Sequence, residues 1–408
     1  RVSFRYIKVK TKGQIEGEKL LVPKLRFKEF HNKWIKLRLK DISNDISYGM
    51  NSAATDFDGI NKYIRITDIN EDTSLYNNSN PVSPSGYLDD KFLLQENDIL
   101  FARTGASTGK TYLYNKDDGK LYFAGFLIRA SIKKDYNSRF VFEQTKLNKY
   151  NNWVKIMSMR SGQPGINSTE YGNYEISITN SEEQEKIAKF VSLLDKKIEL
   201  QQRRIEALKI YKKGLIQKLI DFNNYPERSV SEFGTIITGA TPSKLIPSYW
   251  NNGTIVWVTP SDITESKDIY TSYDMLTVDG LSAGRFIPAG SVLVTCIASI
   301  GKNAILKTDG SCNQQINAII PNENFNADYL YYLFEMKKDY LQSIAGTSAT
   351  SIINKSSFEK LVFKVPSIEQ QNKSSKILNC LELKIENEKF KLKKLNLLKK
   401  SLLQQMFI

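Results

Sequence analysis

The sequence predicts an α/β (α+β) fold with two globular domains, joined by two long helices that form an antiparallel coiled coil, and with an internal pseudo-two-fold repeat. Three observations predict this arrangement. The second half of the 408-residue chain resembles the first half at a nearly constant offset. Short apolar runs separated by turn residues indicate strands within each half. Each half then ends in a long segment with heptad spacing, which is typical of a coiled coil.

The composition is that of a folded, basic protein. The chain has 58 Lys and Arg against 44 Asp and Glu, which makes the net charge +14, and 41% of its residues are hydrophobic. This hydrophobic content excludes wholesale disorder, and the length indicates two or three domains. A basic excess of this size favours a polyanionic partner such as nucleic acid. The alternative is a basic protein whose charge serves only solubility.

The sparse cysteines and the single histidine exclude several kinds of chemistry. Cys296, Cys312 and Cys380 are odd in number and far apart, which indicates a reducing compartment and no zinc or disulfide framework. The lone imidazole, His31, is expected to be structural or solvent-facing. We predict a cytoplasmic location without a membrane partner, because a long uncharged apolar stretch is absent. Residues 1–22 read as an untrimmed leader or an expression remnant.

The internal repeat sets the domain boundaries. It is clearest in four pairs of segments, namely Tyr63–Ile69 with Val256–Ile263, Ile99–Lys110 with Val292–Lys302, Gly162–Ile178 with Gly346–Pro366, and Ser181–Gln184 with Ser367–Gln370. The offset falls from 194 at Asp68 and Asp262 to 187 at Ile198 and Ile385, as differences in loop length would produce. These matches divide the chain into domains at 23–180 and 223–366, each followed by a helical segment, at 181–222 and 367–408.

Within each predicted domain, the signals indicate a mixed or antiparallel sheet with a helix late in the domain. Examples of strand-like runs are Asp98–Ala102, Phe126–Ala130 and Ser291–Thr295. The helical pattern covers 141–157 in the first domain and 327–343 in the second.

The heptad positions of the long segments predict how the two helices pair. The predicted seam consists of Leu194, Ile198, Ile205, Leu208, Lys212, Leu215 and Leu219 in the first helix and of Leu381, Ile385, Glu388, Leu392, Leu395, Leu402 and Met406 in the second. A parallel pair would set Lys212 against Lys399, so we expect an antiparallel pair with Lys212 beside Glu388, Gln201 beside Lys399 and Leu208 beside Leu392. The alternative is an amphipathic helix lying on a globular core. The predicted seam is about 38 Å long, close to one turn of B-DNA.

Motifs for catalysis are incomplete. Gly105–Thr111 resembles a phosphate-binding P-loop but has one residue too few between its glycines. The acidic cluster around Asp262 and Glu265 is too crowded to resemble a nuclease site convincingly. The tetrapeptide that amino-methyltransferases place against a flipped base is absent from the sequence. We therefore expect binding rather than catalysis, and neither a metal nor a cofactor in this chain.

Polar loop residues are the candidate DNA contacts, since Arg and Gln read base edges and Lys and hydroxyl groups contact phosphates. The candidates are Tyr48, Lys62, Arg65, Thr67, Arg103, Thr104, Lys110, Arg129, Gln163, Thr241, Ser243, Lys244, Tyr249, Thr259, Ser261, Lys302, Gln314 and Thr347. Each has the alternative of a solvated surface residue. For the Gly-Lys turns at Lys110 and Lys302, a purely structural turn is equally compatible with the sequence.

The sequence resembles the specificity subunit (HsdS) of type I restriction-modification systems over residues 22–408. The resemblance rests on the repeat, on Gly239–Ser243, on Val22–Phe27 followed by Trp34, and on Pro366–Gln370. It implies two target-recognition domains, each reading one half of an asymmetric, bipartite site in double-stranded DNA, with helices that set the spacer. It also implies two methyltransferase (HsdM) subunits that use S-adenosylmethionine, and restriction (HsdR) subunits that use ATP and Mg. The alternative is a DNA-binding or protein-binding scaffold outside restriction-modification.

The distribution of charge qualifies the inference from net charge. Residues 23–180 carry +4 and residues 221–366 carry −3, so the two domains together hold only +1 of the +14. The leader and the two helices carry the remainder. We therefore expect DNA binding to depend on local contacts and on the assembled complex, and the isolated chain to bind DNA weakly.

Overall fold

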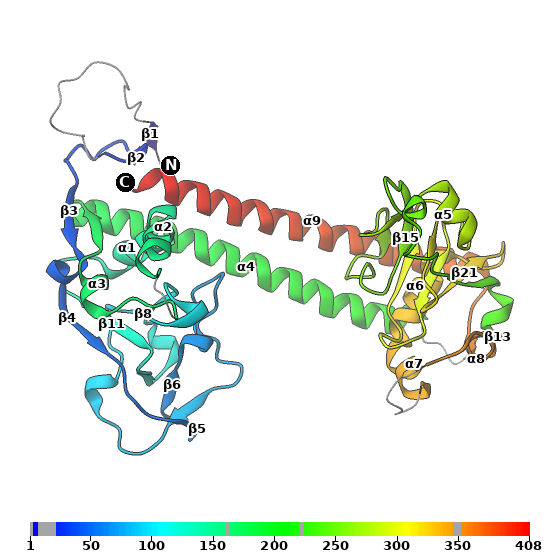
Figure 1. Ribbon diagram of the computed structural model, residues 1–408, viewed down its shortest axis with the longest axis horizontal. Helices are drawn as coiled ribbons and strands as arrows, with labels where there is room; N and C mark the ends of the chain where they lie inside the picture. The colour runs from blue at the N-terminus through cyan, green and yellow to red at the C-terminus, as the bar shows by residue number, and fades with distance from the viewer. Residues whose placement is uncertain (1–2, 7–21, 160–162, 221–223, 346–351) are drawn as a thin grey trace. The chain divides into compact units, whose positions relative to one another are not determined.

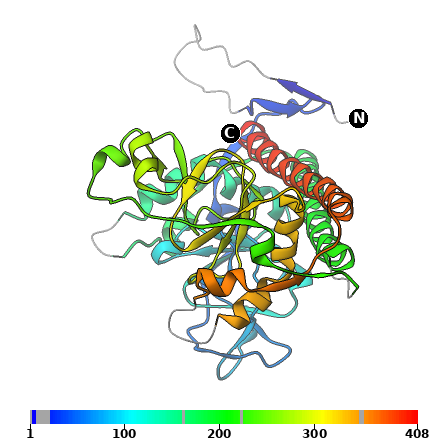
Figure 2. The same ribbon diagram turned by 90° about the vertical axis from the view of Figure 1, so that its right-hand side faces the viewer.

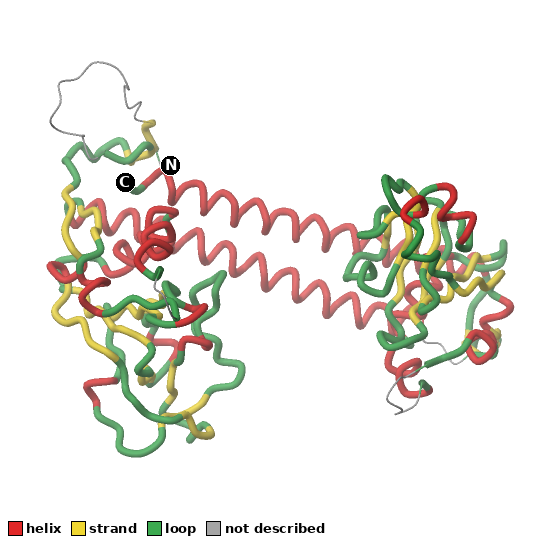
Figure 3. The backbone as a smooth tube through the Cα atoms, in the orientation of Figure 1, coloured by secondary structure: helices red, strands yellow, loops and turns green. Residues whose placement is uncertain are grey.

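The computed structural model describes residues 3–6, 22–159, 163–220, 224–345 and 352–408. These residues form two compact units, and each unit contains part of both long helices. Unit 1 comprises residues up to Leu200 together with Leu392–Ile408, and unit 2 comprises Gln201–Lys391. Strands and loops make up most of each unit outside the long helices (Figure 3).

Unit 1 is built on a four-stranded antiparallel sheet with the order β4-β11-β8-β9. A parallel pair, β6 with β10, lies outside this sheet. The strands of unit 1 are β1 (Phe4–Tyr6), β2 (Leu25–Phe27), β3 (Ile35–Arg38), β4 (Ser43–Tyr48), β5 (Ala54–Asp56), β6 (Lys62–Ile64), β7 (Val82–Pro84), β8 (Asp98–Ala102), β9 (Thr111–Leu113), β10 (Leu121–Phe123), β11 (Leu127–Ile132) and β12 (Glu175–Ile178). Its short helices are α1 (Ser138–Glu143), α2 (Asn148–Met157) and α3 (Ser168–Gly172).

Unit 2 repeats this plan. Its main sheet has the order β14-β21-β18-β19-β16, and β15 pairs in parallel with β20. The strands are β13 (Glu227–Ser229), β14 (Gly234–Thr238), β15 (Ile255–Val258), β16 (Asp268–Ile269), β17 (Met275–Leu276), β18 (Val292–Thr295), β19 (Asn303–Leu306), β20 (Gly310–Cys312), β21 (Ile316–Pro321) and β22 (Val362–Lys364). The short helices are α5 (Val278–Ala283), α6 (Ala327–Met336), α7 (Lys338–Ile344) and α8 (Lys355–Glu359).

The hydrogen bonds confirm the internal repeat at the level of single residues. The amide of Gly109 donates to Ala102 in unit 1, and the amide of Gly301 donates to Thr295 in unit 2. Likewise, Ile166 donates to the carbonyl of Arg103, and Ile353 donates to that of Cys296. The mixed α/β fold with two related copies is therefore as predicted.

The helix expected late in each domain is interrupted in both. In unit 1 the segment 141–157 divides into α1 and α2, because the side chain of Gln144 turns to the backbone of Ser177, donating to its carbonyl and accepting from its amide at 2.9 Å. In unit 2 the segment 327–343 divides at Lys337 into α6 and α7.

The long helices are α4 (Ser181–Ile220) and α9 (Ile368–Met406), which run side by side in Figure 1. Every predicted seam residue is buried or half-buried, so the apolar stripe was assigned to the correct face. The helices are antiparallel, because the start of α4 at Ile187 shares a core cluster with the end of α9 at Met406 in unit 1, and the end of α4 at Ile220 shares one with Leu378 near the start of α9 in unit 2. Lys212 pairs with Glu382 in unit 2, and Lys399 pairs with Asp195 in unit 1.

The predicted register of the helices is wrong, because the polar contacts lie six to eleven residues away from the predicted partners. Lys212 contacts Glu382 rather than Glu388, and Lys399 contacts Asp195 rather than Gln201. Gln201 instead donates to Glu388 at 2.6 Å, and this hydrogen bond lowers the pKa of the Glu388 carboxyl. A seam of period seven fits almost equally well after a slip of about one heptad, so spacing alone could not select the register.

The described part of the predicted leader belongs to the fold of unit 1. Strand β1 pairs antiparallel with β2, and the ring of Phe4 stacks on Phe27 with their centroids 4.8 Å apart. Figure 2 shows this strand pair beside the end of α9. Residues 7–21 lie outside the described residues. The side chain of His31, at 2.7 Å from Arg5, makes a structural contact in this region.

A charge exchange between the helices tests the register. Lys212→Glu and Glu382→Lys should each lower the melting temperature, because each places like charges together in a partly buried pair. The double variant should recover much of the loss, with a coupling of about 1 kcal/mol measured by thermal unfolding. Glu388→Lys serves as the control partner. Rescue of Lys212→Glu by Glu388→Lys instead of Glu382→Lys would support the register predicted from the sequence.

Candidate nucleic-acid interface

In unit 2, many of the candidate residues gather on loops that follow β14, β15 and β20. The loop after β14 approaches the loop after β20, since Thr241 donates to the side chain of Gln314 at 2.5 Å. Asn313 donates to the carbonyl of Val258, which brings the end of β15 to the same place. Thr259 and Ser261, which follow β15, are joined by a hydrogen bond of 2.8 Å between their hydroxyls. These loops present exposed hydroxyl and amide groups together.

A glycine without room for a side chain holds these loops together in each unit. A Cβ on Gly239 would lie 2.2 Å from the carbonyl oxygen of Asn313, and one on Gly49 would lie 2.2 Å from that of Ala124. The amides that follow are used identically, because Ala240 donates to Cys312 and Met50 donates to Phe123. Gly239 is the first residue of the Gly-x-x-Pro-Ser segment noted in the sequence, so close backbone approach explains that glycine.

The lysine of the same loop is fixed by aromatic rings and a carboxylate. The ammonium of Lys244 lies 3.5 Å from the ring centroid of Trp250 and 5.0 Å from that of Trp257. It also pairs with Asp274 at 2.6 Å. The indole of Trp250 in turn donates to the carbonyl of Ser243. The loop is therefore held rigidly, while Tyr249 closes the short 3-10 turn Pro247–Tyr249 beside it.

In unit 1, four of the candidates come together although they are far apart in the sequence. The guanidinium of Arg103 lies 4.8 Å from the ring centroid of Tyr48. Thr104 forms a β-bridge with Gly165, and a Cβ on Gly105 would lie 3.1 Å from the amide nitrogen of Gln163. An exposed aromatic ring with a stacked guanidinium and a neighbouring amide can contact base edges or phosphates.

Ser168 completes this cluster and was not found from the sequence. Its amide and its hydroxyl both donate to the phenolic oxygen of Tyr48, each at 3.1 Å. Desolvation opposes ionisation of the phenol, but these hydrogen bonds and the charge of Arg103 outweigh it and lower the pKa of Tyr48. Sequence reasoning missed Ser168 because a single serine, 120 residues away from Tyr48 in the chain, belongs to no recognisable motif.

Other candidates in unit 1 make internal contacts. Arg65 donates to both carboxylate oxygens of Asp68 at 2.9 Å, and Thr67 lies beside the same carboxylate. Arg129 donates to the carbonyl of Lys91 and to Ser47. Lys62 donates to the carbonyl of Asp118. These interactions occupy part of the donors that base reading would use, whereas the guanidinium of Arg103 contacts the ring of Tyr48 through its face. Thr347 lies outside the described residues.

The two Gly-Lys turns differ between the units. Lys110 pairs with the carboxylate of Glu71 at 3.4 Å, whereas Lys302 donates to the carbonyl of Pro260 at 3.3 Å. The P-loop-like segment Gly105–Thr111 connects the antiparallel strands β8 and β9, and so forms a hairpin connection. A nucleotide P-loop instead leads from a strand into a helix. The carboxylate of Asp262 accepts from Thr259 and Tyr273, and so caps its own loop.

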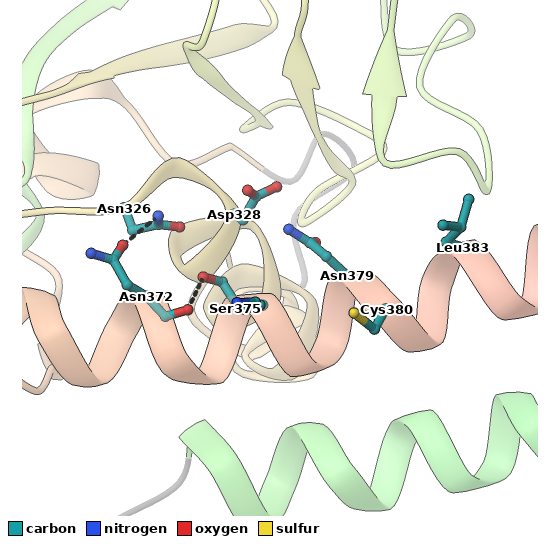
Figure 4. A pocket seen from close by; sticks show the side chains of 8 residues that line it. Asn326, Asp328, Asn372, Ser375, Asn379, Cys380 and Leu383 are labelled. Atoms are coloured by element: carbon teal, nitrogen blue, oxygen red, sulfur yellow. Dashed lines mark hydrogen bonds between the residues drawn. The ribbon is translucent and has the colours of Figure 1, made fainter.

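A groove of about 400 Å³ lies along α9 in unit 2 and separate from these loops. Figure 4 shows the side chains that line it, which are Asn326, Asp328, Asn372, Ser375, Lys376, Asn379, Cys380 and Leu383. The side-chain amide oxygen of Asn379 accepts from Lys267 and from Tyr332, each at 2.9 Å. Leu383 is 64% exposed at one end of the groove. We call this surface the α9 groove.

The described residues include no group of three or more His, Cys, Asp or Glu side chains that could hold a metal ion. Their helices include none that is long and apolar enough to cross a membrane. The three cysteines are free, and Cys296 and Cys312 are buried.

The fold and the loops define a duplicated α/β protein in which each copy presents one cluster of polar loops. The chain belongs to the family of type I restriction modification DNA specificity domains, whose model matches residues 31–209 and 223–397. A relative from Methanocaldococcus jannaschii, the specificity subunit of the type I restriction enzyme MjaIX, is 33% identical over 168 residues. The match covers 40% of this chain and 39% of the relative, so it spans less than half the length of that curated protein.

Solved structures show the same fold. One, from work on complex assembly and conformational transition of the type I R-M system, has a TM-score of 0.62 at 14% identity and covers 92% of this chain and 97% of that chain. The type I restriction-modification S subunit from M. genitalium has a TM-score of 0.58 at 15% identity. That match covers 95% of this chain and 99% of the other.

Adding one methyl group at Gly239 tests the architecture of the unit 2 cluster. Gly239→Ala should lower the free energy of unfolding by about 2–4 kcal/mol, because the Cβ meets backbone atoms that cannot move aside alone. Thermal unfolding of the full chain measures this change. Gly214→Ala is the matched control, since a Cβ there meets open space in α4, and it should stabilise the helix by about 1 kcal/mol. Equal melting temperatures for Gly239→Ala and the unsubstituted chain would contradict the role of Gly239.

Proposed function

We propose that this chain is the sequence-specific DNA-recognition subunit of a type I restriction-modification complex. In this proposal, each globular domain, 23–180 and 223–366, reads one half of an asymmetric bipartite site in double-stranded DNA. The helical segments 181–222 and 367–408 set the spacer between the half-sites. The chain itself is not an enzyme, and it acts in the cytoplasm.

One observation carries the proposal of two different half-sites. The two units share a backbone skeleton, but equivalent loop positions carry different chemistry. The carbonyl of Arg103 accepts from the amide of Ile166 in unit 1, and the carbonyl of Cys296 accepts from the amide of Ile353 in unit 2. Arg103 and Cys296 therefore occupy equivalent positions. Where unit 1 has Arg65, unit 2 has Thr259, and both amides donate to the aspartate three residues later. A common scaffold with different side chains supports two readers of different sequence.

We further propose that the chemistry belongs to partner subunits. Two methyltransferase (HsdM) subunits would supply S-adenosylmethionine and flip one adenine in each half-site, and restriction (HsdR) subunits would supply ATP and Mg. The α9 groove is our proposed contact for a methyltransferase subunit in unit 2. Its polar amides lie beside the exposed apolar side chain of Leu383, and protein interfaces combine such polar and apolar groups.

Mapping of modified DNA tests the proposed function. The chain co-expressed with its methyltransferase subunits should methylate adenines in one recurring split motif with unlike halves, read by genome-wide modification sequencing. Exchange of residues 23–180 for the equivalent domain of another family member should change one half of the motif only. The absence of a recurring split motif would contradict the proposal, and a change in both halves would contradict the assignment of one half to each domain.

A charge in the α9 groove tests the proposed docking. Leu383→Asp should lower the yield of co-purified methyltransferase subunit at least tenfold, because it would bury an unpaired carboxylate in the interface. Leu245→Asp is the matched control, since Leu245 is 92% exposed on the loop after β14 and should leave the yield unchanged. Undiminished recovery with Leu383→Asp would place the methyltransferase contact elsewhere.

A further inference from the structure

The turn after β18 in unit 2 encloses a small basic cavity. The cavity has a volume of about 250 Å³ and is lined by Ala298, Ser299, Ile300, Lys302, Lys338 and Gln342. Two of the six are lysines, and the other polar side chains are a hydroxyl and an amide. Carboxylates are not among the described residues that line it. Residues 221–366 carry a net charge of −3, so this pair of cations is a local exception to the charge of its domain.

The cavity is built on a rigid turn. Ile300 is buried in the core of unit 2, and Gln342 donates to its carbonyl at 3.2 Å. The amide of Lys302 donates to the hydroxyl of Thr295 at 3.0 Å. Gly301 has a φ of 79°, and a Cβ there would lie 3.0 Å from Cγ of Lys338. The turn therefore brings Lys302 and Lys338 to one cavity without further rearrangement.

Ala298, which lines the cavity, has a strained backbone conformation. Ala298 has a φ of 60°, a left-handed conformation that costs an alanine about 1 kcal/mol. Strain of this kind persists where the surrounding structure imposes it, and it concentrates at binding sites. The equivalent turn in unit 1 lacks the second lysine, since a Cβ on Gly109 would meet Val154, and Lys110 is paired with Glu71. The basic cavity is thus a feature of unit 2.

We infer that Lys302 and Lys338 together hold one phosphate group of the DNA backbone in this cavity. The inference rests on the proposed function and adds Lys338, which the sequence did not indicate. The ammonium of Lys302 donates to the carbonyl of Pro260 and has two further N–H groups for an anion, Lys338 lines the same cavity, and the hydroxyl of Ser299 adds a donor. Such a contact fixes the position of unit 2 on the duplex and carries no base specificity itself.

The salt dependence of DNA binding tests this inference. We would assemble the full chain with its methyltransferase subunits and measure anisotropy on DNA bearing its motif across a range of KCl concentrations. Lys338→Ala should lower the slope of log K against log salt, for which the loss of one whole phosphate contact is worth about 0.9. That full change of about 0.9 belongs to Lys302→Ala/Lys338→Ala, which removes both contacts to the phosphate, whereas Lys338→Ala alone should give a smaller decrease because Lys302 still contacts the same phosphate. Lys360→Ala, at an exposed lysine elsewhere in unit 2, should leave the slope unchanged.

Neutral methylphosphonates in the DNA identify the phosphate. One position should weaken binding of the unsubstituted complex and have no further effect on Lys302→Ala/Lys338→Ala. An unchanged slope for Lys338→Ala, with methylation of the split motif retained, would overturn the inference and leave the proposed function intact. A second outcome would also overturn the DNA contact. In that outcome, 10 mM inorganic phosphate raises the melting temperature of the unsubstituted chain but not of Lys338→Ala, and the salt slopes of DNA binding are the same for both proteins. The cavity would then bind free phosphate rather than DNA. Loss of the split motif in the unsubstituted complex would instead count against the proposed function.

Discussion

A buried glutamine near the start of each long helix connects that helix to its domain. The side chain of Gln184 accepts from the amide of Asn137, which caps α1, and donates to the carbonyl of Thr179. In unit 2, Gln371 accepts from the amide of Asn326, which caps α6, and donates to Pro366 and Asn324. Both glutamines are nearly inaccessible, so an unpaired amide at either place would be costly. These hydrogen bonds set the direction in which each helix leaves its domain.

The glutamines also correct the alignment of the repeat. The sequence pairs Ser181–Gln184 with Ser367–Gln370, but the structural equivalent of Gln184 is Gln371, one residue later. Unit 1 strengthens the same junction with a buried ion pair. Arg26 donates twice to Glu183 at 2.7 Å, and the indole of Trp34 donates to that carboxylate as well. This contact gives a physical reason for the basic residue and the tryptophan noted near the start of the sequence.

The fold was largely predictable from the sequence, because periodicity and self-similarity determine it. Apolar spacing located both long helices and their seam faces, and the repeat located corresponding turns at Gly109 and Gly301. The register could not be predicted, because a heptad slip preserves the apolar pattern. Nor could spacing show that Arg65 and Arg129 donate within unit 1, since such partners become neighbours only after folding. Lys338 was missed for the same reason, because it lies within the predicted helical segment 327–343 and lines the same cavity as Lys302 only in the folded chain.

The difference between net charge and local charge bears on how such a protein binds DNA. The first domain, 23–180, carries +4 and the segment 221–366 carries −3, yet both contain a turn with a lysine after a glycine. In unit 1 a carboxylate neutralises that lysine, whereas in unit 2 a second lysine reinforces it. A domain that repels DNA overall can therefore still position it, provided that its cations converge on one phosphate and its other loops remain neutral and polar. In the proposed complex, attraction over longer distances would then come from the basic helices and from the partner subunits, and for this reason we expect the isolated chain to bind DNA weakly despite its net charge of +14.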